Sequence, residues 1–179
     1  KKQVEVNVLQ LNLAEVEEPI RNRVAESGLI QLELSELISI DCVEIDFTSW
    51  LHEGLVVIEK DFRNEATKLD VESYKGKGVG LKVSGDAIVP DWAWMVICAK
   101  LDNAAFVVTG GLNGAQTEAL RRGINALDLE KFKDQRIIVR GCDGAAGPEG
   151  LILFQTKLQP VAKSIMFGEA CSTVPVYKK

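Results

Sequence analysis

The sequence predicts an α/β protein: a mainly parallel sheet with helices on both faces, built from two similar βαβα units and preceded by an N-terminal strand and helix extension. Two observations lead to this fold class. Short apolar runs typical of buried strands alternate with helical periodicities along the chain, which is the order of a parallel sheet. Residues 82–101 and 139–158 each have the pattern of a strand, a polar turn and a helix.

Residues 1–19 form an extension ahead of the domain. Val4, Val6 and Val8 alternate with polar residues, which indicates a strand that joins a sheet edge or docks on a neighbour. Pro19 opens a short predicted helix that ends at Gly28. With 179 residues, of which 46% are hydrophobic, the chain is long enough for one substantial core. Residues 20–179 are therefore expected to form a single domain.

The remaining elements follow in order. Alternating or β-branched apolar runs predict strands at 29–37, 42–47, 79–83, 105–108, 136–139 and 164–167. Helical spacing predicts helices at 52–69, 90–101, 117–127 and 149–158. The helix over 52–69 is the least regular, because Val56 and Val57 also suit a strand and Gly54 weakens a helix start.

The two halves of the domain match each other beyond their periodicity. The segment 69–75 aligns with the segment 127–133 at a constant offset of 58 (127 minus 69). The shared LDxExΦK run, in which Φ is aromatic, exceeds what two unrelated strand-helix units require. We interpret the match as an internal repeat over about 41–101 and 104–167. Asp86 and Cys142 would then occupy equivalent positions, each just after a strand.

Composition excludes several classes of protein. A net charge of −5 speaks against a general nucleic-acid binder, because phosphate contacts need a basic face. We find no apolar run of about 18 residues, so no membrane partner is expected. The first residues do not have the pattern of a signal peptide. The four cysteines contain no C-x-x-C spacing, and we expect reduced thiols in a cytoplasmic protein.

Candidate site residues follow from the rule that ligands bind beyond the carboxyl ends of parallel strands. Asp86, Asp91, Trp92 and Glu169 are the candidate ligand contacts at that edge. A further candidate is a metal site formed by Cys142 and Cys171, because thiolates beside carboxylates suit zinc or iron.

Each candidate has a structural alternative. The cysteines can be small residues that pack strand ends. A nucleophilic cysteine would need His52, the one histidine, as its base, and a lone histidine near a helix start is more often a surface residue.

Two functions remain open from the sequence. The first is a domain that binds a small ligand or a metal at the strand carboxyl edge, with or without catalysis. The alternative is a non-catalytic protein–protein interaction module, such as a homodimer that uses residues 1–19 or the surface around Trp92 and Trp94.

Four stretches resemble a family of small, uncharacterised bacterial proteins known only as a domain of unknown function. They are NRVAESGL at 22–29, EKDFR at 59–63, SGDAIVPDWAWM at 84–95 and LQPVAKSIMFGEACSTVPVYK at 158–178. The resemblance implies no activity, but Asp86, Glu169 and Cys171 lie inside the matching stretches. Separately, IDFTSW followed by a predicted helix resembles the outline of the interaction domains of anti-sigma-factor antagonists, a likeness of architecture that assigns no function.

Overall fold

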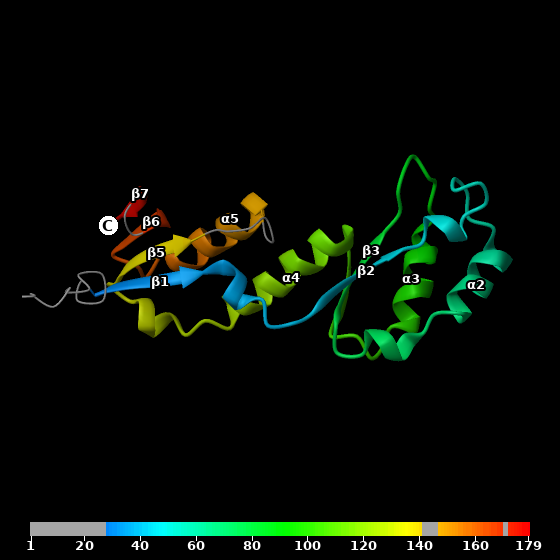
Figure 1. The fold of residues 1–179 in the computed structure, drawn as a ribbon, viewed down its shortest axis with the longest axis horizontal. Helices are drawn as coiled ribbons and strands as arrows, with labels where there is room; N and C mark the ends of the chain where they lie inside the picture. The colour runs from blue at the N-terminus through cyan, green and yellow to red at the C-terminus, as the bar shows by residue number, and fades with distance from the viewer. Residues whose placement is uncertain (1–27, 141–146, 170–171) are drawn as a thin grey trace, which may run out of the picture.

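The computed structural model describes residues 28–140, 147–169 and 172–179, which form an elongated α/β molecule with a sheet toward each end (Figure 1). The three-stranded sheet is parallel and has the order β2-β3-β4, from β2 (Cys42–Asp46), β3 (Gly78–Lys82) and β4 (Phe106–Thr109). Its strands are connected through η2 (Thr48–Trp50), α2 (Glu59–Thr67), η3 (Val71–Tyr74) and α3 (Asp91–Lys100).

The four-stranded sheet is mixed and has the order β1-β5-β6-β7. Its members are β1 (Leu29–Glu33), β5 (Arg136–Arg140), β6 (Ser164–Glu169) and β7 (Ser172–Lys178). The first three strands are parallel, and β7 pairs antiparallel with β6. The short helices η1 (Leu34–Leu37) and η4 (Leu129–Phe132) and the helix α5 (Gly147–Leu158) complete this part of the chain.

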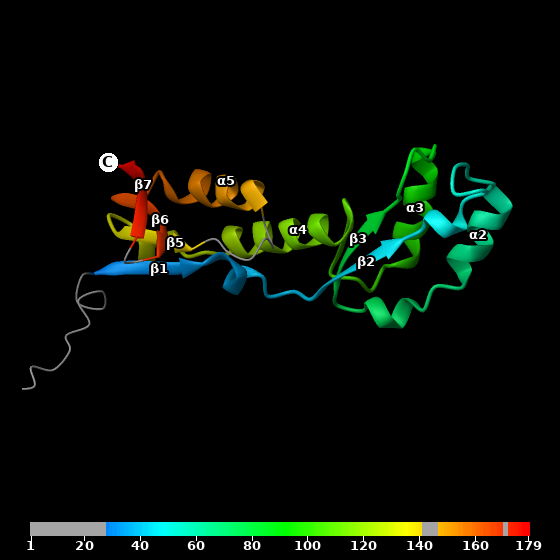
Figure 2. The same cartoon turned by 45° about the horizontal axis from the view of Figure 1, so that its top comes forward.

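Helix α4 (Gly111–Asn125) lies between the two sheets (Figure 2). Its first half packs on the three-stranded sheet, where Ala115 and Ala119 join Phe106 in a small core. Its second half contributes Leu120 and Ile124 to the core of the four-stranded sheet. This one helix therefore connects the two hydrophobic cores.

The strand β3 is covered on both faces. Val79 and Leu81 point into a core that also contains Phe62 of α2 and Ile97 of α3. On the opposite face, a Cβ atom at Gly80 would lie 1.7 Å from the carbonyl oxygen of Gly111, which opens α4. Position 80 is glycine because the backbone of α4 occupies the place of a side chain.

The α/β class with mainly parallel strands is confirmed, but the single sheet that the sequence predicted is wrong, since the strands divide between two. The prediction of helices on both faces holds, within the described residues, for the three-stranded sheet alone. In the four-stranded sheet, α4 and α5 contribute to the same core. The extension at residues 1–19 lies outside the described residues. None of the helices in the described part of the chain has the length and apolar character that a membrane crossing requires.

The predicted helix over 52–69 is also wrong in its first half. Helix α2 begins at Glu59, and the residues before it form turns and isolated bridges. Glu53 and Gly54 have positive φ values of 52° and 70°, which a helix excludes. The β-branched residue Val56 instead makes an antiparallel bridge to His52 and a parallel bridge to Ile88.

Candidate functional site at the carboxyl edge of the three-stranded sheet

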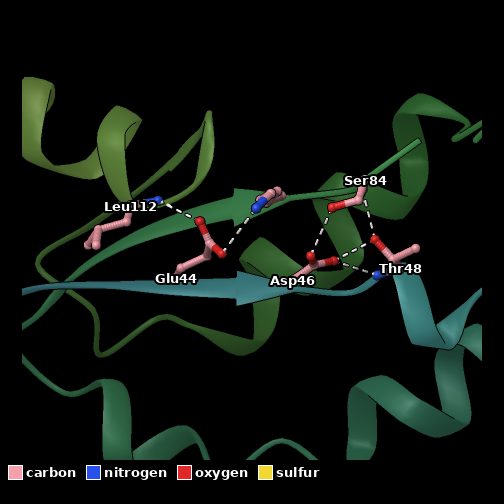
Figure 3. Close-up of polar contacts among 6 residues, drawn as sticks. Glu44, Asp46, Thr48, Ser84 and Leu112 are labelled. Carbon is pink, nitrogen blue, oxygen red and sulfur yellow. Dashed lines mark hydrogen bonds and ion pairs between the residues drawn. The ribbon is translucent and has the colours of Figure 1, made fainter. Parts of the chain in front are cut away.

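A polar cluster of Asp46, Thr48 and Ser84 closes the carboxyl ends of β2 and β3 (Figure 3). One carboxylate oxygen of Asp46 accepts hydrogen bonds from the backbone N–H of Thr48, at 3.0 Å, and from its hydroxyl. The other oxygen accepts from the Ser84 hydroxyl at 3.1 Å. The Thr48 hydroxyl in turn accepts from the Ser84 N–H at 2.8 Å.

These bonds make Asp46 a structural anchor. The hydrogen bonds from the side chain and backbone of Thr48 hold the pKa of the Asp46 carboxyl below its ordinary value, and the Ser84 hydroxyl and Lys82 act in the same direction. The carboxylate is therefore ionised at neutral pH, and both of its oxygens already accept hydrogen bonds. Its effect is to hold the turn at Thr48 against the end of β3.

The N-terminus of α4 is occupied by a side chain of the neighbouring sheet. The Glu44 carboxylate of β2 accepts a hydrogen bond from the backbone N–H of Leu112 at 2.9 Å (Figure 3). It also lies 3.6 Å from the Lys82 ammonium. A carboxylate is stabilised at the positive end of a helix dipole, so Glu44 attaches α4 to the sheet where an external anion would otherwise bind.

Four large aliphatic side chains are exposed just beyond this edge. They are Leu55 (49% exposed), Val56 (49%), Ile58 (41%) and Ile88 (74%), and we refer to them as the aliphatic surface. They belong to two loops that are joined by backbone pairing: the Ile88 N–H donates to the Leu55 carbonyl at 2.8 Å, and Val56 bridges Ile88. The aliphatic surface is therefore held in one place rather than scattered.

An aromatic cluster lies in the core between β2, α2 and α3. Phe47 and Phe62 are fully buried at its centre. The Trp94 ring meets Phe47 edge-on, with 4.9 Å between ring centroids, and Trp92 meets Phe62 edge-on at 5.9 Å. Both tryptophans are half-buried, and the Trp92 ring also carries the Arg63 guanidinium at 5.5 Å. Such edge-to-face packing holds α2 and α3, the helices at which the two loops end, against the residues that follow β2.

Carboxylates lie next to the aliphatic surface along the chain. Glu53, Asp86 and Asp91 are exposed and lie close to Leu55 or Ile88 along the chain. The segments 51–58 and 83–91 contain no Lys or Arg, so their formal charge is −3 with His52 neutral. An open hollow of about 500 Å³ adjoins them and is lined by Asp46, Thr48 and Glu53 among others. This edge therefore combines apolar area with negative charge.

The other candidate residues lie elsewhere. Glu169 ends β6 in the four-stranded sheet, where it pairs with Arg140 at 3.2 Å. Arg140 also lies 3.2 Å from Glu33 of β1, and Glu169 and Glu33 raise the pKa of its guanidinium. Asp86 comes after β3 and Glu169 is the last residue of β6, so the two carboxylates belong to different sheets.

The metal candidates Cys142 and Cys171 are outside the described residues. Among the residues that are described, no three His, Cys, Asp or Glu side chains come together as a metal site. His52 belongs to the turn before α2, where its backbone pairs with Val56. Burial, with a smaller effect of Asp41, raises the pKa of the Cys42 thiol, which does not favour a nucleophilic thiolate there.

The aliphatic surface itself was missed by sequence reasoning. The predicted helix over 52–69 places Leu55 and Ile58 on its apolar side, which would bury them. A signal was present, because an apolar run that directly follows glycine and contains adjacent β-branched residues favours an extended loop.

Comparison with known proteins places the chain in a family. Residues 18–179 match the model of a family described as "Protein of unknown function (DUF2480)", so the chain belongs to that family. No curated protein and no solved structure matches.

Proposed function

We propose that this member of the DUF2480 family is a protein-binding module that docks a basic segment of a partner protein on the aliphatic surface. The observation that carries the proposal is that Leu55, Val56, Ile58 and Ile88 are exposed together and fixed by backbone hydrogen bonds. Large contiguous apolar patches on a protein surface often mark binding sites.

The energetics favour a moderate, reversible contact. Covering the exposed part of an aliphatic side chain contributes on the order of 1 kcal/mol at about 25 cal/mol per Å². Four such side chains alone correspond to weak binding, since association has an entropic cost. The remaining affinity has to come from charge.

Charge complementarity selects a basic partner segment. The carboxylates of Glu53, Asp86 and Asp91 attract Lys and Arg side chains. This attraction increases the association rate, and it becomes weaker when salt is added. Trp92 directly follows Asp91 and is half-buried. The residues expected from the sequence to contact a small ligand, Asp86, Asp91 and Trp92, are in this proposal the polar rim of a protein-binding surface.

A synthetic peptide in which Leu and Lys alternate is a direct probe. We expect it to change the tryptophan fluorescence of the full chain in a saturable, salt-sensitive manner. A Leu55→Ser/Ile88→Ser double variant should weaken binding at least about tenfold, equivalent to about 1.4 kcal/mol. The matched control is Ile152→Ser, because Ile152 is 64% exposed on α5 beside the other sheet.

A peptide in which Leu and Glu alternate separates specific docking from general stickiness. If it binds as tightly as the basic peptide, charge complementarity is refuted. If the double variant binds like the wild type, the aliphatic surface is not the site.

A metal-binding function is a second proposal, carried by the thiols of Cys142 and Cys171. Zinc or iron would suit these thiolates with a nearby carboxylate. Metal analysis of freshly purified, reduced protein tests it, with Cys142→Ala and Cys171→Ala as the comparison. Protein without stoichiometric metal would exclude this function and leave the protein-binding proposal untouched.

We further infer that the two sheets descend from an internal duplication. The same offset of 58 relates β3 to β5 (136 minus 78), β4 to β6 (164 minus 106) and η3 to η4 (129 minus 71). In this scheme β1 takes the place of β2, because each is the parallel neighbour of the middle strand of its sheet. One unit would then be inserted within the other.

Backbone detail supports the same offset. The Gly76 N–H donates to the Asn103 carbonyl at 2.9 Å, and the Asp134 N–H donates to the Val161 carbonyl at 2.8 Å. Both donors have positive φ values, 71° and 54°. A conformation that non-glycine residues rarely adopt is thus found at two positions that the offset relates (134 minus 76).

A further inference from the structure

A second cavity lies at the carboxyl end of β4, apart from the aliphatic surface. Its volume is about 350 Å³, and it is lined by Thr109 of β4, by Asn113, Thr117 and Arg121 of α4, and by Glu149 of α5 among others. Asn113, Thr117 and Arg121 recur at every fourth position, so they share one side of the helix. The cavity is therefore an open hollow bordered by a strand end and two helices.

Thr117 is the informative residue. It is only 7% exposed and lines the cavity, yet its hydroxyl makes no hydrogen bond with any residue that the structure describes. The hydroxyl itself is not fully buried, so it is available to a ligand or water that enters the cavity. By contrast, the Thr156 hydroxyl of α5 donates to the Ile152 carbonyl at 2.8 Å, the usual solution for a threonine in a helix.

The charged groups of the cavity are already paired. Arg121 lies 3.2 Å from Glu118 and 3.3 Å from Glu149, and the second oxygen of Glu118 accepts from Arg122 at 2.9 Å. An anionic ligand such as phosphate would meet two carboxylates around the one guanidinium that lines the cavity. The polar groups that have no partner within the described residues are neutral: the hydroxyls of Thr109 and Thr117 and the Asn113 amide.

We propose that this cavity binds a small neutral polyhydroxylated compound, of the size of a monosaccharide or a cyclic polyol. Hydroxyl groups on the ligand can donate to and accept from threonine hydroxyls and an asparagine amide alike. A volume near the lower end of the range for ligand pockets suits a compound of this size. The site is also where open α/β sheets bind ligands, beyond a strand's carboxyl end.

The test uses the full chain, with glucose, myo-inositol and inorganic phosphate as probes in separate titrations followed by ¹H–¹⁵N NMR. We expect one of the two polyols to shift the backbone amides of Thr109, Asn113 and Thr117 in a saturable manner, and phosphate to have no such effect. Thr117→Val keeps the shape and removes the hydroxyl, so it should weaken this binding at least about tenfold. Thr67→Val, on α2 and outside the cavity, is the matched control and should bind like the wild type.

The thermal stability of the variants shows whether a loss of binding comes from the missing contact or from unfolding. Because the Thr117 hydroxyl has no partner in the described structure, Thr117→Val should melt at or above the wild-type temperature, so lost binding cannot be ascribed to unfolding. Asn113→Ala changes an exposed residue and gives an independent second variant with the same expected loss. A cavity that holds water only would give no saturable shift with either polyol, and that result overturns the proposal. Saturable binding of phosphate at these amides, or unchanged polyol binding by Thr117→Val, does the same.

Discussion

The middle strands of the two sheets differ at one position that decides how each sheet is covered. Gly80 of β3 and Ile138 of β5 are related by the offset of 58 (138 minus 80), and both lie on the face opposite the main core of their sheet. Over Gly80 the backbone of α4 approaches directly, whereas Ile138 keeps a large, fully buried side chain. The three-stranded sheet thus meets the backbone of α4 at this position, whereas the four-stranded sheet carries a buried isoleucine there.

The carboxyl edges of the two sheets also differ, in the groups that hold them together. In the three-stranded sheet, Asp46 accepts hydrogen bonds from neutral hydroxyl and N–H groups. In the four-stranded sheet, Arg140 lies between Glu33 and Glu169. Arg140 corresponds to Lys82 at the offset of 58 (140 minus 82), so a basic residue at the end of the middle strand is common to both. The partners of the two residues differ, because within the described residues Lys82 forms an ion pair with Glu44 alone, whereas Arg140 pairs with both of its neighbouring carboxylates.

Substituting Gly80 is expected to have the largest effect, because it breaks the contact that distinguishes the sheets. In Gly80→Ala the new Cβ would meet a backbone carbonyl at 1.7 Å, which a rotamer change cannot relieve. We expect a loss of about 3 kcal/mol in the free energy of unfolding, measured by urea denaturation. Gly85→Ala is the control: its φ is 76° and no atom lies within 4 Å of the new Cβ, so the expected loss is about 1 kcal/mol. Equal losses would refute the close packing of α4.

Exchanging two core residues, one from the core of each sheet, is expected to have the next largest effect. Phe62 and Leu120 are fully buried and are related by the same offset (120 minus 62). Phe62→Leu removes ring contacts with Phe47, Trp50 and Trp92 and should cost about 2 kcal/mol, with a change in tryptophan emission. The partner substitution Leu120→Phe overfills the other core and should cost about 1–3 kcal/mol.

Tryptophan emission provides the check on this exchange. Trp50, Trp92 and Trp94, the chain's three tryptophans, pack against or near the core of the three-stranded sheet. Leu120→Phe should therefore leave the native emission spectrum unchanged. Similar spectral changes in both variants would mean that the two cores are coupled through α4.

A smaller effect is expected at the two left-handed turns. Gly76→Asp places a side chain at φ 71° in open space and should lower the free energy of unfolding by about 1 kcal/mol. Asp134→Gly, at φ 54°, relieves this strain. It also removes an exposed ion pair with Lys179 and makes the unfolded chain more flexible. The free energy of unfolding should therefore change by no more than about 0.5 kcal/mol. Thermal unfolding measures both. A large loss in Asp134→Gly would contradict the equivalence of the turns.

The sequence predicted most strands and helices because their apolar periodicity is local. The predicted strand at 79–83 and β3 differ by one residue at each end, and the predicted strand at 136–139 is one residue short of β5. The division into two sheets could not be predicted, because β1 pairs with β5, which lies far along the chain beyond the whole three-stranded sheet. Strand β7 was missed, since Pro175 interrupts its alternation.

The candidate site was predicted only in its location. Asp86 and Asp91 do lie beyond the end of a parallel strand, as the rule for open sheets requires. The prediction placed Leu55 and Ile58 on the apolar side of a helix, because periodicity does not separate a helix from a loop that is paired across the chain. The bridge between Val56 and Ile88 is such a pairing, and it depends on tertiary contacts.

The smallest effect is expected from Asp46→Asn, which tests whether hydrogen bonding to a charged group holds the edge of the three-stranded sheet. Asp46 is exposed, so the loss at neutral pH should stay below about 1 kcal/mol. The pKa of this carboxyl is lower in the folded state than its ordinary value of 3.8. Its contribution is therefore fully present above that value and is lost as the pH falls through the lower, folded-state pKa.

The difference in melting temperature between wild type and Asp46→Asn should accordingly be constant near neutral pH and shrink in acid. Thr48→Val removes the hydroxyl that donates to Asp46, and in that background the difference should be smaller at every pH. A difference that persists undiminished below the folded-state pKa would show that the carboxylate charge contributes nothing. The edge beneath the aliphatic surface would then be held by the shape of the Thr48 turn alone, unlike the ion-paired edge at Arg140.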